Sequence, residues 1–123
     1  AERLGVGADV ELPGLVANPY AWMARASLFA LSSAWEGFGN VLVEAMACGC
    51  PVVSTDCPSG PAEILGGGRY GPLVPVGDAE ALAAAMARVL DAPPDPAALR
   101  ARAAEFTVGR ATDGYLDALF GRA

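Results

Sequence analysis

One stretch decides how this chain folds, and it reads Ser32-Ser33-Ala34-Trp35-Glu36-Gly37-Phe38-Gly39-Asn40-Val41-Leu42-Val43-Glu44-Ala45-Met46-Ala47. It begins where the apolar segment 28–31 ends, and it continues through a loop that contains glycines at positions 37 and 39. A helix is predicted from about residue 40 to 48, because apolar residues recur along one face. Glu36 lies in the loop, and Glu44 lies in the first turns of that helix.

The rest of the chain repeats this alternation of strand and helix. Short apolar runs predict strands over 10–12, 27–31, 51–54 and 73–76, and helices are predicted over 19–25, 40–48, 62–65, 78–90, 96–106 and 112–120. Alternation of this kind is typical of an α/β protein with a parallel, Rossmann-like sheet. Ligands of such folds bind beyond the carboxyl ends of the strands. The loops 13–18, 32–40 and 55–61 are therefore expected to face one crevice.

The central loop and the helix start suit an anionic ligand. Glycine lets a ligand approach the backbone closely, and the free N–H groups of a helix start attract phosphate. A carboxylate would repel phosphate, so we expect Glu36 and Glu44 to accept hydrogen bonds from neutral hydroxyls instead. A phosphate site between two carboxylates that hold diols suits a sugar joined to a nucleoside through a diphosphate, which is a nucleotide sugar.

These residues also carry a resemblance to a known family. The segment from Glu36 to Glu44, with its continuation to Ser54, resembles the E-x7-E signature of GT-B glycosyltransferases, family 4 (group 1) in particular. Two further segments, 60–64 and 71–74, are similar to the same family, and the resemblance spans about residues 4 to 106. The segments 39–40 and 56–61 are similar to bacterial enzymes that build surface polysaccharides and glycans.

The resemblance implies a role for each residue of the motif. Glu36 would bind hydroxyls of the transferred sugar and act in catalysis, whereas Glu44 would hold the ribose diol. The implied donor-binding set is Glu36, Gly37, Phe38, Gly39, Asn40, Val41 and Glu44. The alternatives are a solvated loop acid at 36, an exposed helix acid at 44 that the helix dipole favours, and a plain turn and cap at 38–40.

For the protein as a whole, the resemblance implies the donor-binding half of a retaining hexosyltransferase that needs no metal or other cofactor. Residues 1–106 would form a donor-binding domain, incomplete at its N-terminus, and residues 107–123 a C-terminal helix with an exposed apolar face. The family sheet order is 3-2-1-4-5-6. Its first two strand–helix units, with the Arg and Lys that hold the diphosphate, and its N-terminal domain would lie outside this sequence. Arg69 and Arg110 are the nearest basic candidates here, but neither matches the motif.

Partners and location follow from the same resemblance. The partners would be a nucleotide sugar, the missing N-terminal portion, and a glycan or lipid-linked acceptor. The full enzyme would lie in the cytoplasm and associate peripherally with the inner face of the membrane. The chain itself has no apolar run long enough to suggest a spanning helix, and its first residues lack a signal-peptide pattern.

The composition argues against nucleic acid as a partner and indicates a structural role for the cysteines. The net charge is −6 and the chain contains no Lys and no His, so no basic patch is available for nucleic acid. Cys48, Cys50 and Cys57 are expected to be small buried residues, because an odd number argues against a disulfide framework and no fourth metal ligand is evident. Trp35 is expected to pack against the protein rather than stack on a ligand.

Two other functions remain open on the sequence. The chain could be a non-catalytic module that binds nucleotide sugars or serves as a scaffold, because the basic residues of the diphosphate site are absent. It could also be a nucleotide-binding domain of another Rossmann-like class. The second alternative is disfavoured, because no G-x-G-x-x-G follows a predicted strand.

Overall fold

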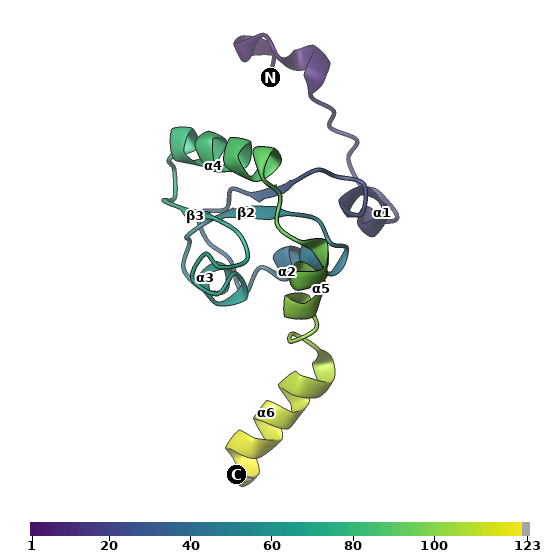
Figure 1. Ribbon diagram of the computed structural model, residues 1–123, viewed down its shortest axis with the longest axis vertical. Helices are drawn as coiled ribbons and strands as arrows, with labels where there is room; N and C mark the ends of the chain where they lie inside the picture. The colour runs from purple at the N-terminus through teal and green to yellow at the C-terminus, as the bar shows by residue number, and fades with distance from the viewer. Residues whose placement is uncertain (122–123) are drawn as a thin grey trace.

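A three-stranded parallel sheet forms the centre of the protein in the computed structural model, which describes residues 1–121 (Figure 1). The strands are β1 (Phe29–Leu31), β2 (Val52–Thr55) and β3 (Leu73–Val74), and they lie side by side in the order β1-β2-β3. Phe29 is opposite Val52, and Ser54 is opposite Leu73. A helix joins each strand to the next, which is the connection that parallel strands require. The predicted α/β fold class is thus confirmed.

Helices cover both faces of this sheet. The helices of the chain are α1 (Pro19–Met23), α2 (Asn40–Ala47), α3 (Pro61–Ile64), α4 (Ala79–Asp91), α5 (Pro96–Ala103) and α6 (Val108–Phe120), and two short 3-10 turns, η1 (Glu2–Leu4) and η2 (Gly7–Asp9), precede them. Helix α6 extends away from the sheet and covers neither face (Figure 1). Figure 1 shows α4 over one face and α2, α3 and α5 over the other. The carboxyl ends of the strands therefore remain available between the two layers.

The core is divided by the central strand. Val52 belongs to one cluster of buried residues, to which α2, α3 and α5 contribute. This cluster also includes Leu42 and Ile64. Val53 belongs to a second cluster with Ala85 and Val89 of α4. Successive side chains of a strand point to opposite faces, so β2 is buried along its whole length because both faces are covered.

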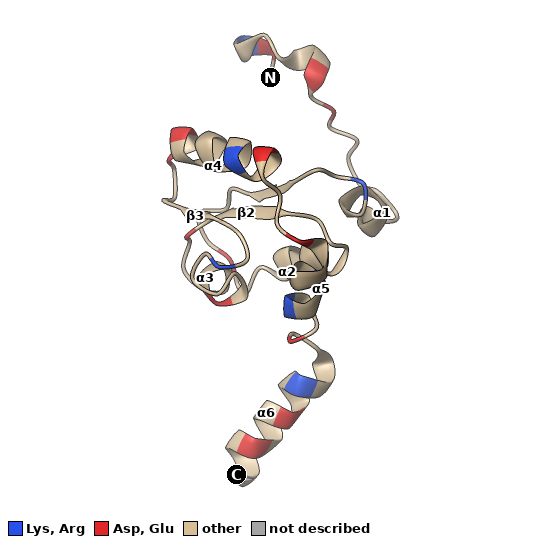
Figure 2. Cartoon of the chain, viewed as in Figure 1, with Lys and Arg blue, Asp and Glu red and all other residues tan. Residues whose placement is uncertain are grey.

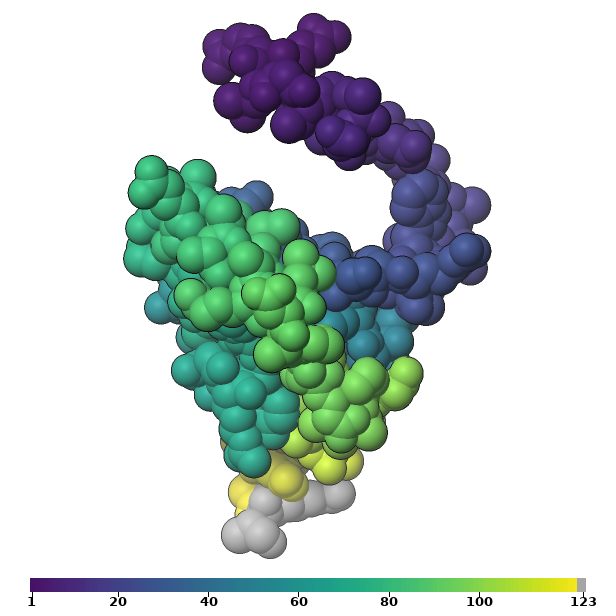
Figure 3. Space-filling model, turned by 45° about the horizontal axis from the view of Figure 1, so that its top comes forward, coloured from purple at the N-terminus to yellow at the C-terminus, as the bar shows by residue number. Residues whose placement is uncertain are grey.

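The expected strand at 10–12 is wrong. Residues Val10 and Leu12 lie in an extended segment that pairs with no strand among residues 1–121, and Leu12 is 90% exposed. A strand needs a hydrogen-bonding neighbour, and the described residues supply none beside this segment. The loop 13–18 therefore follows no strand, and the expectation that it faces the crevice loses its basis. Figure 3 shows this N-terminal part arching away from the body of the protein.

The C-terminal helix begins earlier than the sequence pattern predicts. Thr107 caps α6, and its Oγ1 accepts a hydrogen bond from the backbone N–H of Arg110 at 3.3 Å. The helix has no buried residue, and Tyr115, Leu119 and Phe120 are exposed as expected. The predicted C-terminal unit 107–123 extends two residues beyond the described ones, and its separation from residues 1–106 stays a prediction.

The charges and the lengths of the helices are relevant to two possible partners, nucleic acid and a membrane. In Figure 2, α4 and α6 each carry acidic residues and an arginine, so neither presents a purely basic face. Among the helices in the described range, none combines the length and the apolar character that crossing a membrane would require.

Candidate functional site

The loop between β1 and α2 holds Glu36 through a neighbouring hydroxyl. Ser33 Oγ donates a hydrogen bond of 2.6 Å to Glu36 Oε1, and the glutamate is half-buried. Thr55 Oγ1, at the end of β2, donates to the carbonyl of Ser33 at 2.5 Å. Hydrogen bonds thus connect the ends of the adjacent strands β1 and β2 to the carboxylate of Glu36. The second oxygen of Glu36 keeps its capacity to accept hydrogen bonds from a ligand.

The start of α2 has no side-chain cap. Gly39 occupies the N-cap position with φ 89°, a left-handed conformation that glycine adopts without steric cost. Leu42 N–H bonds the Gly39 carbonyl at 2.9 Å, whereas the N–H groups of Asn40 and Val41 have no acceptor within residues 1–121. By contrast, side-chain oxygens cap α1, α4, α5 and α6. The short helix α3 also begins at a glycine without a side-chain cap, but it carries the acid Glu63 in its first turn. The N–H groups at the start of α2 are therefore available to an acceptor from outside the chain.

Glu44 lies one turn after these free N–H groups. It is four residues from Asn40, so both lie on the same side of α2. Leu42, Ala45 and Met46 are fully buried and take the side that packs on the sheet, which leaves the half-buried Glu44 at its margin. The structure thus places Glu36 before, and Glu44 after, the uncapped helix start. That they bind a ligand together stays a prediction.

A cavity of about 610 Å³ borders the predicted loop. Its walls include Phe38 and Asn40 from the motif and Arg110 and Tyr115 from α6, and two acids, Glu63 and Glu105, line it as well. Arg110 is therefore a positive charge close to the start of α2, which the sequence suggested only as one of two candidates. Arg69 instead lies over the ring of its neighbour Tyr70, 5.4 Å from the ring centre.

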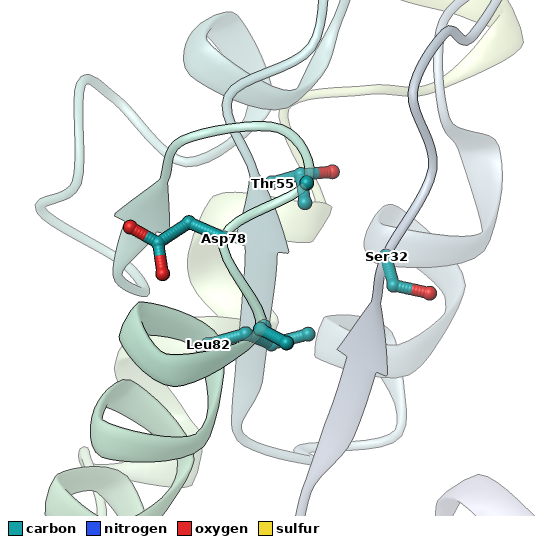
Figure 4. Close-up of a pocket in the computed structure, with 6 residues that line it drawn as sticks. Ser32, Thr55, Asp78 and Leu82 are labelled. Atoms are coloured by element: carbon teal, nitrogen blue, oxygen red, sulfur yellow. The ribbon is translucent and has the colours of Figure 1, made fainter.

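A second, smaller cavity lies at the ends of β1 and β2. Its volume is about 140 Å³, and Ser32, Thr55, Asp78 and Leu82 are among its walls (Figure 4). Figure 4 shows the carboxylate of Asp78 turned away from Ser32 and Thr55. This carboxylate caps α4 by accepting the N–H of Ala81 at 2.8 Å. Because an acid already occupies this helix start, the cavity is a poor place for a phosphate.

The expected packing of Trp35 is wrong. The residue is 72% exposed, because the loop carries it beyond the sheet. The loop itself is held by a contact that the sequence analysis did not foresee. Gly60 has φ 98°, and a Cβ atom there would lie 1.6 Å from the carbonyl oxygen of Phe38. The pair Gly60-Pro61 before a helix was the available signal, but only the fold shows which backbone it touches.

The three cysteines are free thiols. Cys50 and Cys57 are buried as expected, whereas Cys48 is half-buried. Burial, and to a smaller extent the neighbouring Cys48, raises the pKa of the Cys50 thiol above its ordinary value. A thiol with a raised pKa is a weak nucleophile at neutral pH. Across residues 1–121, no three side chains of His, Cys, Asp or Glu gather as metal ligands.

With this geometry established, the chain can be compared with known proteins. Residues 1–92 match the family described as glycosyl transferases group 1. The match covers most of the sequence, including the loop, the start of α2 and the sheet. The chain belongs to this family of glycosyltransferases.

Its relatives are considerably longer. A Campylobacter jejuni protein named N-acetylgalactosamine-N,N'-diacetylbacillosaminyl-diphospho-undecaprenol 4-alpha-N-acetylgalactosaminyltransferase is 45% identical over 75 residues, which are 61% of this chain and 20% of that protein. The lipopolysaccharide core biosynthesis glycosyltransferase LpsE of Rhizobium meliloti is 35% identical over 124 residues, covering 97% of this chain and 36% of its own length.

Solved structures show the same arrangement. The apo form of the lipopolysaccharide outer core galactosyltransferase WaaB superimposes with a TM-score of 0.86 at 25% identity, over 99% of this chain and 36% of that one. A sucrose-phosphate synthase from Thermosynechococcus elongatus gives a TM-score of 0.77 at 31% identity, over 99% of this chain and 33% of its own. The GT-B assignment of the fold therefore agrees with these neighbours.

Proposed function

We propose that this chain binds the nucleotide-sugar donor of a retaining glycosyltransferase that acts in bacterial polysaccharide or glycan biosynthesis. One observation carries the proposal: the start of α2 is uncapped and lies between Glu36 and Glu44 in the chain. A cap would occupy the N–H groups that a diphosphate needs. The names of the relatives, two of which concern lipopolysaccharide, support this direction.

Each part of the site has a task in this reaction. The bond between the anomeric carbon and the diphosphate breaks, so negative charge grows on the leaving phosphate and positive charge grows on the sugar. The N–H groups at 39–41 and the dipole of α2 stabilise the phosphate. Glu36 binds sugar hydroxyls beside the positive centre, and Glu44 holds the ribose diol. The acceptor is a glycan or a lipid-linked glycan, reached at the cytoplasmic face of the membrane.

The proposal is tested with the complete enzyme and a set of nucleotide sugars that differ in base and sugar. We expect one of them to bind in calorimetry and to give transfer to a glycan acceptor, with retention of anomeric configuration in the product by NMR. Binding without transfer to any acceptor would favour the non-catalytic module instead. Absence of binding by every nucleotide sugar would contradict both functions.

The isolated chain gives a second prediction. Residues 1–123 alone should transfer no sugar, because half an elementary charge at a helix start is a weak match for a diphosphate and an acceptor site is not evident. β1 pairs only with β2 among the described residues, so its other edge can pair with a second chain. We expect self-association in light scattering. A monodisperse monomer with transferase activity would contradict this prediction.

A further inference from the structure

Two aromatic rings connect the loop of the proposed donor site to the segment after α5. The rings of Phe38 and Phe106 lie 5.8 Å apart between centres and are tilted by 59°. Both residues are half-buried. This is a favourable arrangement for an aromatic pair. Phe38 directly precedes Gly39, so its side chain fixes the backbone immediately before the free N–H groups of α2.

Arg102 of α5 holds the second ring in place. Its guanidinium lies 4.6 Å from the centre of the Phe106 ring and 5.3 Å from that of Tyr70. Arg102 Nε donates to the carbonyl of Ile64 at 3.0 Å, and Nη2 donates to the carbonyl of Glu63 at 2.6 Å. These carbonyls lie at the end of α3, where a cation is favoured by the dipole. An ion pair with Glu105 completes the set.

The same short helix touches the loop at its other end. Gly60 precedes α3, and its backbone lies so close to the carbonyl of Phe38 that a side chain has no room. The loop is thus held from two directions, by the backbone at the start of α3 and by the Phe106 ring. Arg102 joins these two supports, because it contacts both Phe106 and the end of α3.

We infer that Arg102 and Phe106 are positioning residues that set the place of the free N–H groups at 39–41 in the reaction. The inference rests on the proposed function, since these groups are there assigned to the leaving phosphate. Stabilisation of developing charge depends on the exact placement of donors. A displacement of about 1 Å at a reacting site can cost roughly a hundredfold in rate. A purely structural α5 would affect stability and leave this placement unchanged.

The test compares Phe106→Ala with Val89→Ala in the complete enzyme. Val89 is a buried residue of α4 in the other core cluster, so its truncation destabilises the fold without touching the loop. We expect Phe106→Ala to lower kcat about tenfold to a hundredfold and to speed hydrogen exchange in peptides covering 42–48, where the hydrogen-bonded amides of α2 lie. Val89→Ala should change neither quantity at a temperature where it is folded. Phe106→Tyr, which keeps the ring, should restore both.

Arg102→Lys provides an independent variant if Phe106→Ala fails to fold. Lysine keeps the charge but loses the planar fork and the stacking, so both the kcat and the exchange protection of 42–48 should fall. Unchanged exchange in both variants, or an equal loss of kcat in Val89→Ala, would overturn the inference. A wild-type enzyme that transfers no sugar would overturn the proposed function, whereas the exchange of 42–48 reports on the support itself.

Discussion

The starts of α2 and α4 occupy equivalent places in the fold, yet their chemistry differs. Each helix follows a strand of the parallel sheet and begins near the carboxyl ends of the strands. The two helices lie on opposite faces of the sheet (Figure 1). Asp78 caps α4 with its carboxylate, and Glu80 adds a second acid in the first turn. α2 begins at Gly39 with neither a side-chain cap nor an acid in its first turn. The cap stabilises α4, whereas the uncapped α2 keeps its N–H groups for an anion.

The comparison teaches that topology alone does not distinguish the two helix starts, and that their first residues do. A parallel sheet offers several helix starts at one edge, and a single residue at the N-cap decides which of them can receive a negative charge. The four predictions below exchange the properties of the two helix starts, test the residues around the uncapped one, or ask whether a metal supplements it.

The largest effect is expected from placing an acid at the start of α2. Gly39→Asp puts a carboxylate beside the proposed phosphate. If the two charges are ~5 Å apart and the effective dielectric constant is ~20, they repel each other by roughly 3 kcal/mol. Donor binding by the complete enzyme should weaken about a hundredfold in calorimetry. Gly39→Asn is the matched control, because Asn and Asp both tolerate a positive φ. Equal losses in the two variants would show that backbone strain, and not charge, is responsible.

The two glutamates should separate in their kinetic effects. Glu44→Gln should weaken nucleotide-sugar binding, because the ribose stays fixed throughout the reaction. Glu36→Gln should mainly lower kcat, because the transferred sugar gains charge in the transition state. Each lost charge-assisted hydrogen bond should cost about 1.5–3 kcal/mol. Steady-state kinetics of the complete enzyme measure this, with Glu80→Gln on α4 as a control. Small and equal effects at both positions would contradict the assigned roles.

The reciprocal change at α4 should alter stability and leave donor binding intact. Asp78→Ala removes the hydrogen bond to the N–H of Ala81, and loss of such a cap typically lowers the free energy of unfolding by about 1 kcal/mol. Urea denaturation measures the loss, and calorimetry with the donor measures the affinity. If the donor affinity fell with the stability, the start of α4 would belong to the binding site.

The smallest effect is expected from metal removal. If helix N–H groups and basic side chains hold the diphosphate, a chelator should leave the transfer rate of the complete enzyme unchanged. The measurement is an initial rate before and after treatment with EDTA, with readdition of Mg²⁺ and Mn²⁺ as the control. Loss of activity that either ion restores would show that a metal supplements the start of α2.

Much of the architecture could be predicted from local patterns. Apolar runs marked β1, β2 and β3, and the predicted helices 19–25, 40–48 and 78–90 agree with α1, α2 and α4 to within two residues at each end. These features depend on residues close together in the chain, where capping and periodicity act. The motif from Glu36 to Glu44 likewise identified the family before any coordinates. The prediction of a strand from Val10 to Leu12 was wrong for the same reason. An apolar run forms a strand only where a neighbouring strand lies beside it.

What the sequence determined by itself is therefore the α/β class, the order of the elements from residue 19 onward and the family to which the chain belongs. Tertiary structure decided which surfaces meet: Gly60 against the backbone of Phe38, Arg102 against the end of α3, and Trp35 left exposed. Arg102 and Glu63 are 39 positions apart. No local pattern records such a contact, because it depends on how the sheet and helices pack after the local elements have formed.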